Sequence, residues 1–183
     1  MKVSDLAWVA GSFYSVVKRV MDNRPFIILP EDYAAWRGPR GYVDNVAHAI
    51  ALACTSPNGN GRIYHVCDEP ALSELEWQKK IVAQTQWSGR FVLLPSECTP
   101  KHLLAFGNAA QHSFGNTDRI RRELGYADLI SMDEAIRRTI AWEQANPPTG
   151  ATFHQFDYPA EDVAAGLAMS GACILRSSPI APP

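Results

Sequence analysis

Hydrophobic residues recur at helical spacing in five stretches of the chain. These stretches are residues 12–23, 44–56, 77–86, 117–126 and 131–148. In the last stretch, we expect Ile136, Ile140 and Trp142 to form the face that packs on the core. The second stretch carries an apolar stripe made of Val46, Ala49, Ile50 and Ala53. The spacing therefore predicts five helices.

Polar residues and glycines mark the ends of these helices. A serine followed three residues later by a glutamate has the spacing of a capping box, which satisfies free N–H groups of the first turn. Glycine favours the left-handed conformation with which many helices end. The predicted N-terminal caps are Ser73 with Glu76, Ser131 with Glu134, and Asp44 or Asn45; the predicted stops are Gly89 and Gly125.

Short apolar runs between the helices predict strands. FIILP at residues 26–30 and RFVLLP at residues 90–95 are apolar almost throughout, whereas RIYHVC at residues 62–67 alternates. Strands that alternate with helices indicate an α/β fold with short, mainly parallel strands packed against helices. Residues 97–115 have no regular pattern.

Composition limits the classes of function. A chain of 183 residues, 46% hydrophobic and 20% charged, suits one globular domain or a piece of a larger one. A net charge of −2 gives no overall attraction to nucleic acid or an anionic membrane. The longest apolar run near the end, GLAMSGACIL, is shorter than the ~20 residues that cross a bilayer. We therefore expect a soluble chain that binds neither nucleic acid nor membrane.

The cysteines and histidines bear on redox state and metal binding. The four cysteines form no C-x-x-C, and no secretory leader is present, so we expect reduced thiols in a cytoplasmic protein. The five histidines have no metal-ligand spacing with one another or with cysteine. The sequence predicts no metal site.

Tyr14 and Lys18 raise the question of catalysis. In YSVVK they lie one helical turn apart, as in the Tyr-x-x-x-Lys pair of short-chain dehydrogenases, where a cation lowers the tyrosine pKa. No Gly-rich phosphate loop occurs anywhere in the sequence, because GNGR follows a turn and enters a strand, whereas such a loop leaves a strand and opens a helix. There is also no P-loop and no Gly-x-Ser-x-Gly elbow. We therefore expect no catalytic residue and no cofactor-binding residue.

Four segments carry a family resemblance. They are RGYVDNVAHAIALA, GRIYHVCDEPALSELEW, NTDRIRRELGY and SMDEAIRRTIAWEQANPP. In this order and spacing, over roughly residues 10–148, they resemble the C-terminal, substrate-binding half of an extended or atypical short-chain dehydrogenase/reductase of the NAD-dependent epimerase/dehydratase family. The resemblance implies the C-terminal part of a Rossmann-like fold, with residues 1–148 as the substrate-binding half and residues 149–183 as a partly irregular extension.

The resemblance also places YSVVK. In that family the catalytic Tyr-x-x-x-Lys lies upstream, in the cofactor half, whereas YSVVK immediately precedes the strand that leads to YVDNVA. The chain begins, with MKVSDLAWVAG, where such a protein would be leaving its cofactor half. We therefore expect a fragment, a truncated product or one polypeptide of a split enzyme. NAD or NADP is implied for the complete oxidoreductase, with none bound by this chain alone.

The family's substrate contacts map onto four residues. In the family, an arginine just before the YVDNVA element holds substrate phosphates. Counted without a gap, that position falls on Gly38, so the candidates are the neighbouring Arg37 and Arg40. Arg40 lies two residues from that position and would point to the same face of an extended segment, whereas Arg37 would not. The implied substrate-binding residues are Arg37, Arg40, Tyr42 and Asn116. The alternative for Arg37 and Arg40 is a solvated loop arginine, and the alternative for Asn116 is a residue that caps a helix. The implied partners are a small-molecule substrate such as a sugar or nucleotide-sugar, and the missing N-terminal half or a second copy.

Two other classes of function remain open. One is a non-catalytic regulator on the same fold, which binds a ligand or a protein; the other is a free-standing interaction module. A substrate half separated from its cofactor half should expose a large apolar patch, and a self-sufficient module should not.

Overall fold

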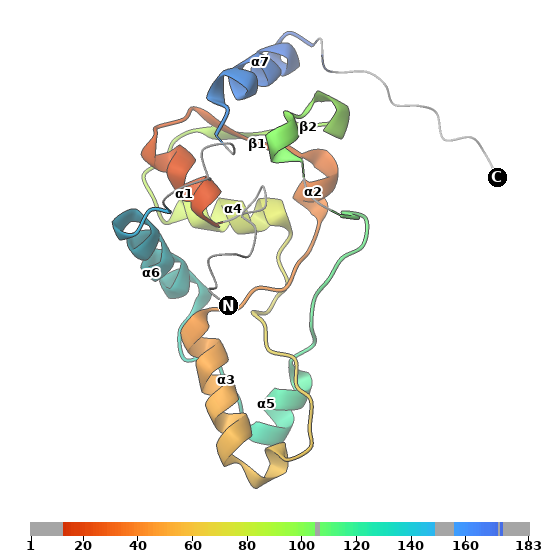
Figure 1. Cartoon of the computed structure of the whole chain (residues 1–183), viewed down its shortest axis with the longest axis vertical. Coiled ribbons are helices and arrows are strands. Elements are labelled where there is room, and N and C mark those ends of the chain that lie inside the picture. The colour runs from red at the N-terminus through yellow and green to blue at the C-terminus, as the bar shows by residue number, and fades with distance from the viewer. Residues whose placement is uncertain (1–12, 105–106, 149–155, 172, 174–183) are drawn as a thin grey trace, which may run out of the picture.

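A pair of parallel strands lies at the centre of the fold. The structure is a computed structural model, and it describes residues 13–104, 107–148, 156–171 and 173. Strand β1 (Phe26–Pro30) pairs in parallel with β2 (Arg90–Leu94), with Ile28 opposite Val92. All five residues of β1 are buried because helices cover both faces of the sheet (Figure 1). The predicted α/β fold with parallel strands is confirmed.

Three helices cover one face of the sheet. They are α1 (Phe13–Met21), α4 (Glu74–Ala83) and α6 (Met132–Ala145). Ile27 of β1 points toward them, since successive side chains of a strand point to opposite faces. The core on this face consists of Val16, Val17, Ile27, Ile81, Ile136 and Ile140. Short α2 (Glu31–Ala35) follows β1 directly.

Helix α7 (Tyr158–Met169) covers the other face, at the top of Figure 1. Its Ala164 and Ala165 pack against Phe26, Ile28 and Leu94. The sequence pattern did not predict this helix, because its inward side consists of alanines and a glutamate rather than large apolar residues. Much of the predicted irregular extension, residues 149–155, 172 and 174–183, lies outside the described residues.

A disulfide corrects the expectation of four reduced thiols. The structure joins Cys98 to Cys173, with 6.3 Å between their Cα atoms, and leaves Cys54 and Cys67 free. Cys98 lies in the short helix η3 (Ser96–Cys98), close to β2, and Cys173 follows α7. The 75-residue separation hid this pair, which forms because α7 folds back onto the sheet.

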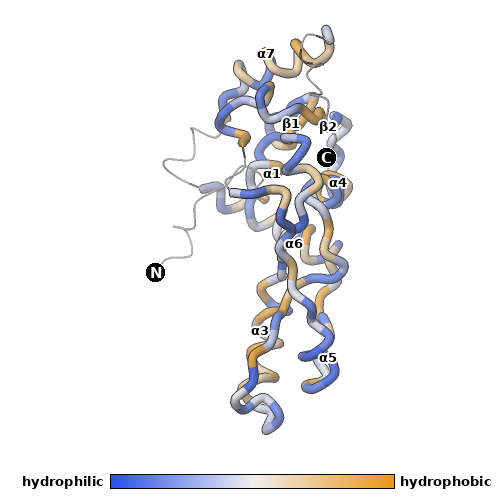
Figure 2. Tube along the Cα trace, turned by 90° about the vertical axis from the view of Figure 1, so that its right-hand side faces the viewer, coloured by the Kyte–Doolittle hydropathy of each residue, from blue (hydrophilic) through white to orange (hydrophobic). Residues whose placement is uncertain are grey.

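Helices α3 (Val43–Thr55) and α5 (Asp118–Leu124) extend away from the sheet as an arm (Figures 1 and 2). Their shared core consists of Ala49, Ile120 and Tyr126. The Asn45 amide donates to the Ile130 carbonyl and accepts from the Ile130 N–H, both at 2.9 Å, which fixes the arm to the loop before α6. The arm also includes the short helix η2 (Pro57–Gly59). Another short helix, η4 (Lys101–Leu103), lies beside β1.

The helix caps differ in part from those predicted. The capping box of Ser73 and Glu76 is present in full, and Gly125 ends α5 in the left-handed conformation with φ 66°. Ser131 accepts from the Glu134 N–H, but the Glu134 carboxylate turns to Arg137 and Arg138. The remaining predictions were wrong: Tyr42, not Asp44 or Asn45, precedes α3, and α4 ends at Ala83, well before Gly89.

Two further predictions need correction. Residues 62–67 are extended but belong to no strand, because no strand lies beside them among the residues that the structure describes. Trp142 is 60% exposed, whereas Ile136 and Ile140 are buried. At 100° per residue Trp142 lies about 160° around α6 from Ile140 and about 120° from Ile136, so it does not share their core face.

Candidate functional site

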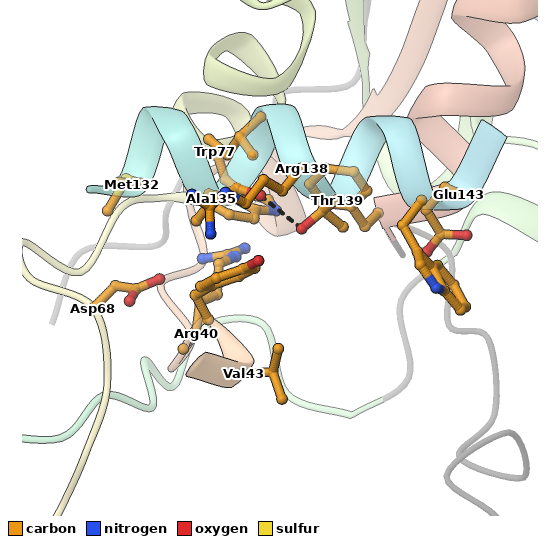
Figure 3. Close-up of a pocket in the computed structure, with 14 residues that line it drawn as sticks. Arg40, Val43, Asp68, Trp77, Met132, Ala135, Arg138, Thr139 and Glu143 are labelled. Carbon is orange, nitrogen blue, oxygen red and sulfur yellow. Dashed lines mark hydrogen bonds between the residues drawn. The ribbon is translucent and has the colours of Figure 1, made fainter. Parts of the chain in front are cut away.

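A cavity of about 800 Å³ lies between α6 and the segment that leads into α3 (Figure 3). This volume is within the range of small-molecule sites. Its apolar walls are Phe13, Trp77, Met132, Ala135, Ile136 and Trp142, with Val43 at its edge. Its polar lining consists of Arg40, Tyr42, Asp68, Arg138, Thr139 and Glu143.

Arg40 is held by the protein itself. Its guanidinium forms an ion pair with Glu74, a carboxylate that is only 1% exposed, and it donates to the Leu72 carbonyl at 3.2 Å and the Gly38 carbonyl at 3.3 Å. The guanidinium also lies 4.9 Å from the Trp77 ring centre. Burial raises the pKa of Glu74, and Arg40 acts against that rise. The guanidinium therefore enters the cavity with most of its donors already used.

Arg138 is the second cation of the cavity, and it too is paired. It donates to Glu134 at 2.7 Å and lies 3.8 Å from the Asp44 carboxylate. Hydrogen bonds to Glu134 and to Tyr42 raise the pKa of Arg138. Tyr42 thus contributes a hydroxyl to the cavity beside a cation that is already neutralised.

Glu143 differs from both arginines. It is 7% exposed, and its Oε2 atom is buried with no hydrogen-bond partner. No ion pair reaches it from the described residues. Burial raises the pKa of Glu143, because a carboxylate without a partner is costly in a medium of low polarity.

Asp68 supplies a second carboxyl, at the opposite end of the row of residues in Figure 3. Its pKa is raised by burial and by the nearby Asp128, against smaller opposing effects of a Tyr42 backbone hydrogen bond and Arg40. Within the described part of the chain, it forms no ion pair. Among the described residues, the two carboxyls of the cavity thus have no ion-pair partner, whereas its two arginines do.

The structure places two of the four predicted substrate-binding residues in the cavity and two outside it. Arg40 and Tyr42 line the cavity together. Arg37 lies outside it, where its guanidinium bonds to the Ala71 carbonyl and pairs with Glu76 at 3.1 Å. Asn116 precedes Thr117, the N-terminal cap residue of α5, and its side chain accepts from the Asp118 N–H at 2.8 Å.

The sequence reasoning missed Glu143, although the chain carried a signal for it. Glu143 follows Ile136 by seven residues and Ile140 by three, so it occupies a position on the core face of α6. An acid at a core position is unusual unless it is paired. Asp68 carried no such signal, because it lies in an extended segment between turns.

Tyr14 is buried on α1, whereas Lys18, one turn later, pairs with an acid at the end of the same helix. Tyr14 is 6% exposed and packs edge-on against Phe156, and Lys18 pairs with Asp22 on the same helix. Burial raises the pKa of Tyr14 more than Lys18 lowers it. A catalytic tyrosine needs the opposite shift.

Metal and membrane features can be stated for the described ranges only. No group of three or more His, Cys, Asp or Glu side chains in these ranges could hold a metal ion. None of the helices in the same ranges has the length and apolar character needed to cross a membrane.

Comparisons with solved structures identify the fold as that of Rossmann-like, NAD-dependent epimerases and dehydratases of the short-chain dehydrogenase type. UDP-glucose 4-epimerase from Thermotoga maritima, determined with UDP-glucose, is similar with a TM-score of 0.56 and 16% identity over 73% of this chain and 39% of its own. The enzyme WbmF from Bordetella bronchiseptica, determined with NAD+ and UDP, is similar with a TM-score of 0.53 and 20% identity over 87% of this chain and 41% of its own.

An epimerase from Methanothermobacter thermautotrophicus is similar too, with a TM-score of 0.55 and 16% identity over 73% of this chain and 37% of its own. The chain thus spans about 40% of the length of the solved structures that it resembles. No family model and no curated protein sequence matches it.

Proposed function

We propose that this chain is the substrate-binding portion of an NAD(P)-dependent epimerase/dehydratase-like oxidoreductase. It would work only when a cofactor-binding half, on the same polypeptide or another, packs against it. The proposed substrate is a sugar or nucleotide-sugar. Arg40 and Tyr42 would contact it within the cavity, and Arg37 and Asn116 would contact any part that extends beyond it.

The observation that most supports this proposal is the apolar outward side of α3. Five exposed residues of this helix are apolar or small, and together they form the α3 stripe: Val43, Ala47, Ile50, Ala51 and Cys54. They fall within an arc of about 100°, the width of a helix face that packs on a core. The opposite side of α3 already packs on α5, so the helix has two apolar sides and only one of them is covered.

The two largest side chains of the α3 stripe are strongly exposed. Val43 is 68% exposed and Ile50 is 58% exposed. If a part of the protein that packs on α3 were removed, it would leave an exposed apolar helix face of this kind. Figure 2 shows apolar residues at intervals along α3. Two observations support a cofactor half as that partner: the chain spans about 40% of the length of its structural neighbours, and its sequence contains no Gly-rich phosphate loop.

A complementation experiment tests the proposal. The coding sequence upstream of the Met1 codon is determined, and its product is produced with this chain. NADH fluorescence then reports assembly of a cofactor site. Ile50→Glu places a charge on the α3 stripe and should weaken assembly at least about tenfold.

Val163→Glu is the matched control, because Val163 is an apolar residue of α7 with 64% exposure and lies far from the stripe in sequence and fold. It should leave assembly unchanged. Equal effects of the two substitutions, or an upstream sequence without a Gly-rich loop, would contradict the proposal. A ligand-binding regulator on the same fold would retain cavity binding but gain no turnover from any added half.

A further inference from the structure

The two arginines of the cavity differ in how firmly they are paired. Arg40 forms its ion pair with the buried Glu74, and only 18% of the Arg40 side chain is exposed. The Arg138 side chain is 47% exposed, and its partners Asp44 and Glu134 also reach solvent. Its contact with Asp44 is long as well, at 3.8 Å. Water and salt screen such exposed pairs, so Arg138 can exchange a carboxylate for another anion at little cost.

Arg40 has no such freedom. Its partner Glu74 is fixed in place, because the Gln78 amide donates to the Glu74 carboxylate at 3.0 Å and the side chain is buried. A phosphate at the Arg40 guanidinium would therefore lie beside a negative charge that cannot turn away into water. Asp44 and Glu134 can turn away from Arg138, since both are open to solvent.

The surroundings of Arg138 complete a site for an anion joined to a ring. Arg138 lies on the α6 side of the cavity (Figure 3), and the Tyr42 hydroxyl, hydrogen-bonded to it, lines the same cavity. Trp142 follows Arg138 by four residues, so its ring lies one turn along the same side of α6. An aromatic ring at that distance can pack against a flat group beside a bound phosphate. Burial raises the pKa of Asp68 and of Glu143, which favours the uncharged form of both carboxyls.

We propose that Arg138, rather than Arg40, binds the phosphate of the substrate, and that Trp142 packs against the ring joined to that phosphate. This inference rests on the proposed function, because it names the residue that holds the charged part of a nucleotide-sugar in the cavity. Arg40 then contacts an uncharged part of the substrate. The sequence did not indicate Arg138, because the family resemblance places the phosphate contact before the YVDNVA element and not on α6.

The experiment uses UDP as the probe and uridine as its counterpart without phosphate, with binding to the full chain measured by calorimetry. UDP should bind saturably, and at least about tenfold more tightly than uridine. Arg138→Gln should weaken UDP binding about tenfold to a hundredfold but leave uridine binding within about twofold. Arg138→Lys keeps the charge and should lose less affinity for UDP than Arg138→Gln does. Trp142→Ala should weaken the binding of both ligands, because both contain the ring.

Arg137→Gln is the matched control. Arg137 is the neighbouring residue, is exposed and pairs with the same Glu134 at 2.7 Å, but it does not line the cavity. The substitution removes the same charge and should leave UDP affinity within about twofold. Equal losses from Arg137→Gln and Arg138→Gln, or absence of saturable UDP binding, would overturn the proposal.

These binding measurements need no cofactor half, so their outcome is separate from that of the complementation experiment. If a cofactor half assembles with the chain but Arg138→Gln leaves UDP binding unchanged, the role of Arg138 is wrong and the proposed function stands. If UDP binding depends on Arg138 but no upstream half forms a cofactor site, the role of Arg138 stands and the proposed function is wrong.

Discussion

Glu161 shows at the scale of one residue how α7 is held on the sheet. Its side chain is fully buried, and it accepts from the Arg19 Nε at 3.2 Å and lies 3.1 Å from the His102 Nε2. Burial alone would raise the pKa of Glu161, but the hydrogen bonds from His102 and Arg19 hold it below its ordinary value. The carboxylate is thus ionised and paired.

Glu161→Gln should destabilise the chain by about 3–5 kcal/mol, because it removes the charge from one side of a buried ion pair, that of Glu161 with Arg19. Chemical denaturation at pH 7 measures this loss. Asp162→Asn on the same helix is the control: the Asp162 side chain is 55% exposed in its pair with Arg24, so the cost should stay below about 1 kcal/mol. Similar costs for the two substitutions would contradict a buried role for Glu161.

The same carboxylate gives a pH dependence. Because its pKa is lowered in the folded state, its contribution to stability is complete above the unfolded pKa of about 4.3 and is lost as the pH falls through the folded value. Unfolding at a series of pH values from 7 downward should therefore show the difference between wild type and Glu161→Gln shrink in acid. A difference that does not change with pH would show that the carboxylate charge does not stabilise α7.

Helix α6 is the element that connects the core to the cavity. Ile136 and Ile140 pack in the core beside β1, and Glu143 and Trp142 line the cavity at its end. One helix thus fixes the cavity wall by the same packing that holds the sheet.

Ile140→Ala should cost about 2–5 kcal/mol, the range for emptying a buried site. Trp142→Ala removes a larger side chain but should cost less than about 1 kcal/mol, since Trp142 is 60% exposed. Thermal and chemical denaturation of both variants measure the contrast. A larger loss of stability from Trp142→Ala would show that Trp142 packs in the core and does not line the cavity.

Helix periodicity on α6 also shows what the sequence could predict. It gave the helix, its serine cap and two core residues, because these depend on local spacing. It misassigned Trp142, because an apolar residue can also lie on the solvent side of a helix, here about 160° around α6 from Ile140. It could not give the cavity, because Asp68, Arg40 and Glu143 come from three distant segments that only tertiary packing brings together.

The same limit applies to α7 and to residues 62–67. Small side chains make the inner face of α7, so its hydrophobic pattern is weak although its packing is close. Residues 62–67 have a strand pattern without a strand beside them in the described chain, since a ladder needs a partner that the sequence of one segment does not supply. The five predicted helices and the strands at residues 26–30 and 90–95 are confirmed, because their patterns are local.

At the scale of the whole molecule, the chain is a sheet covered by helices on both faces, with an arm whose outer side is apolar (Figures 1 and 2). Its fold is that of part of the epimerases and dehydratases that it resembles, over about 40% of their length. We propose that this part holds substrate and depends on another part for the cofactor.

Calorimetry with NADH and NADPH tests that claim most directly. The isolated chain should show no saturable binding at millimolar nucleotide, because backbone N–H groups of a Gly-rich loop are what hold the pyrophosphate in such folds. The same chain assembled with a cofactor half should bind one of the two nucleotides. A micromolar dissociation constant for the isolated chain would contradict the account.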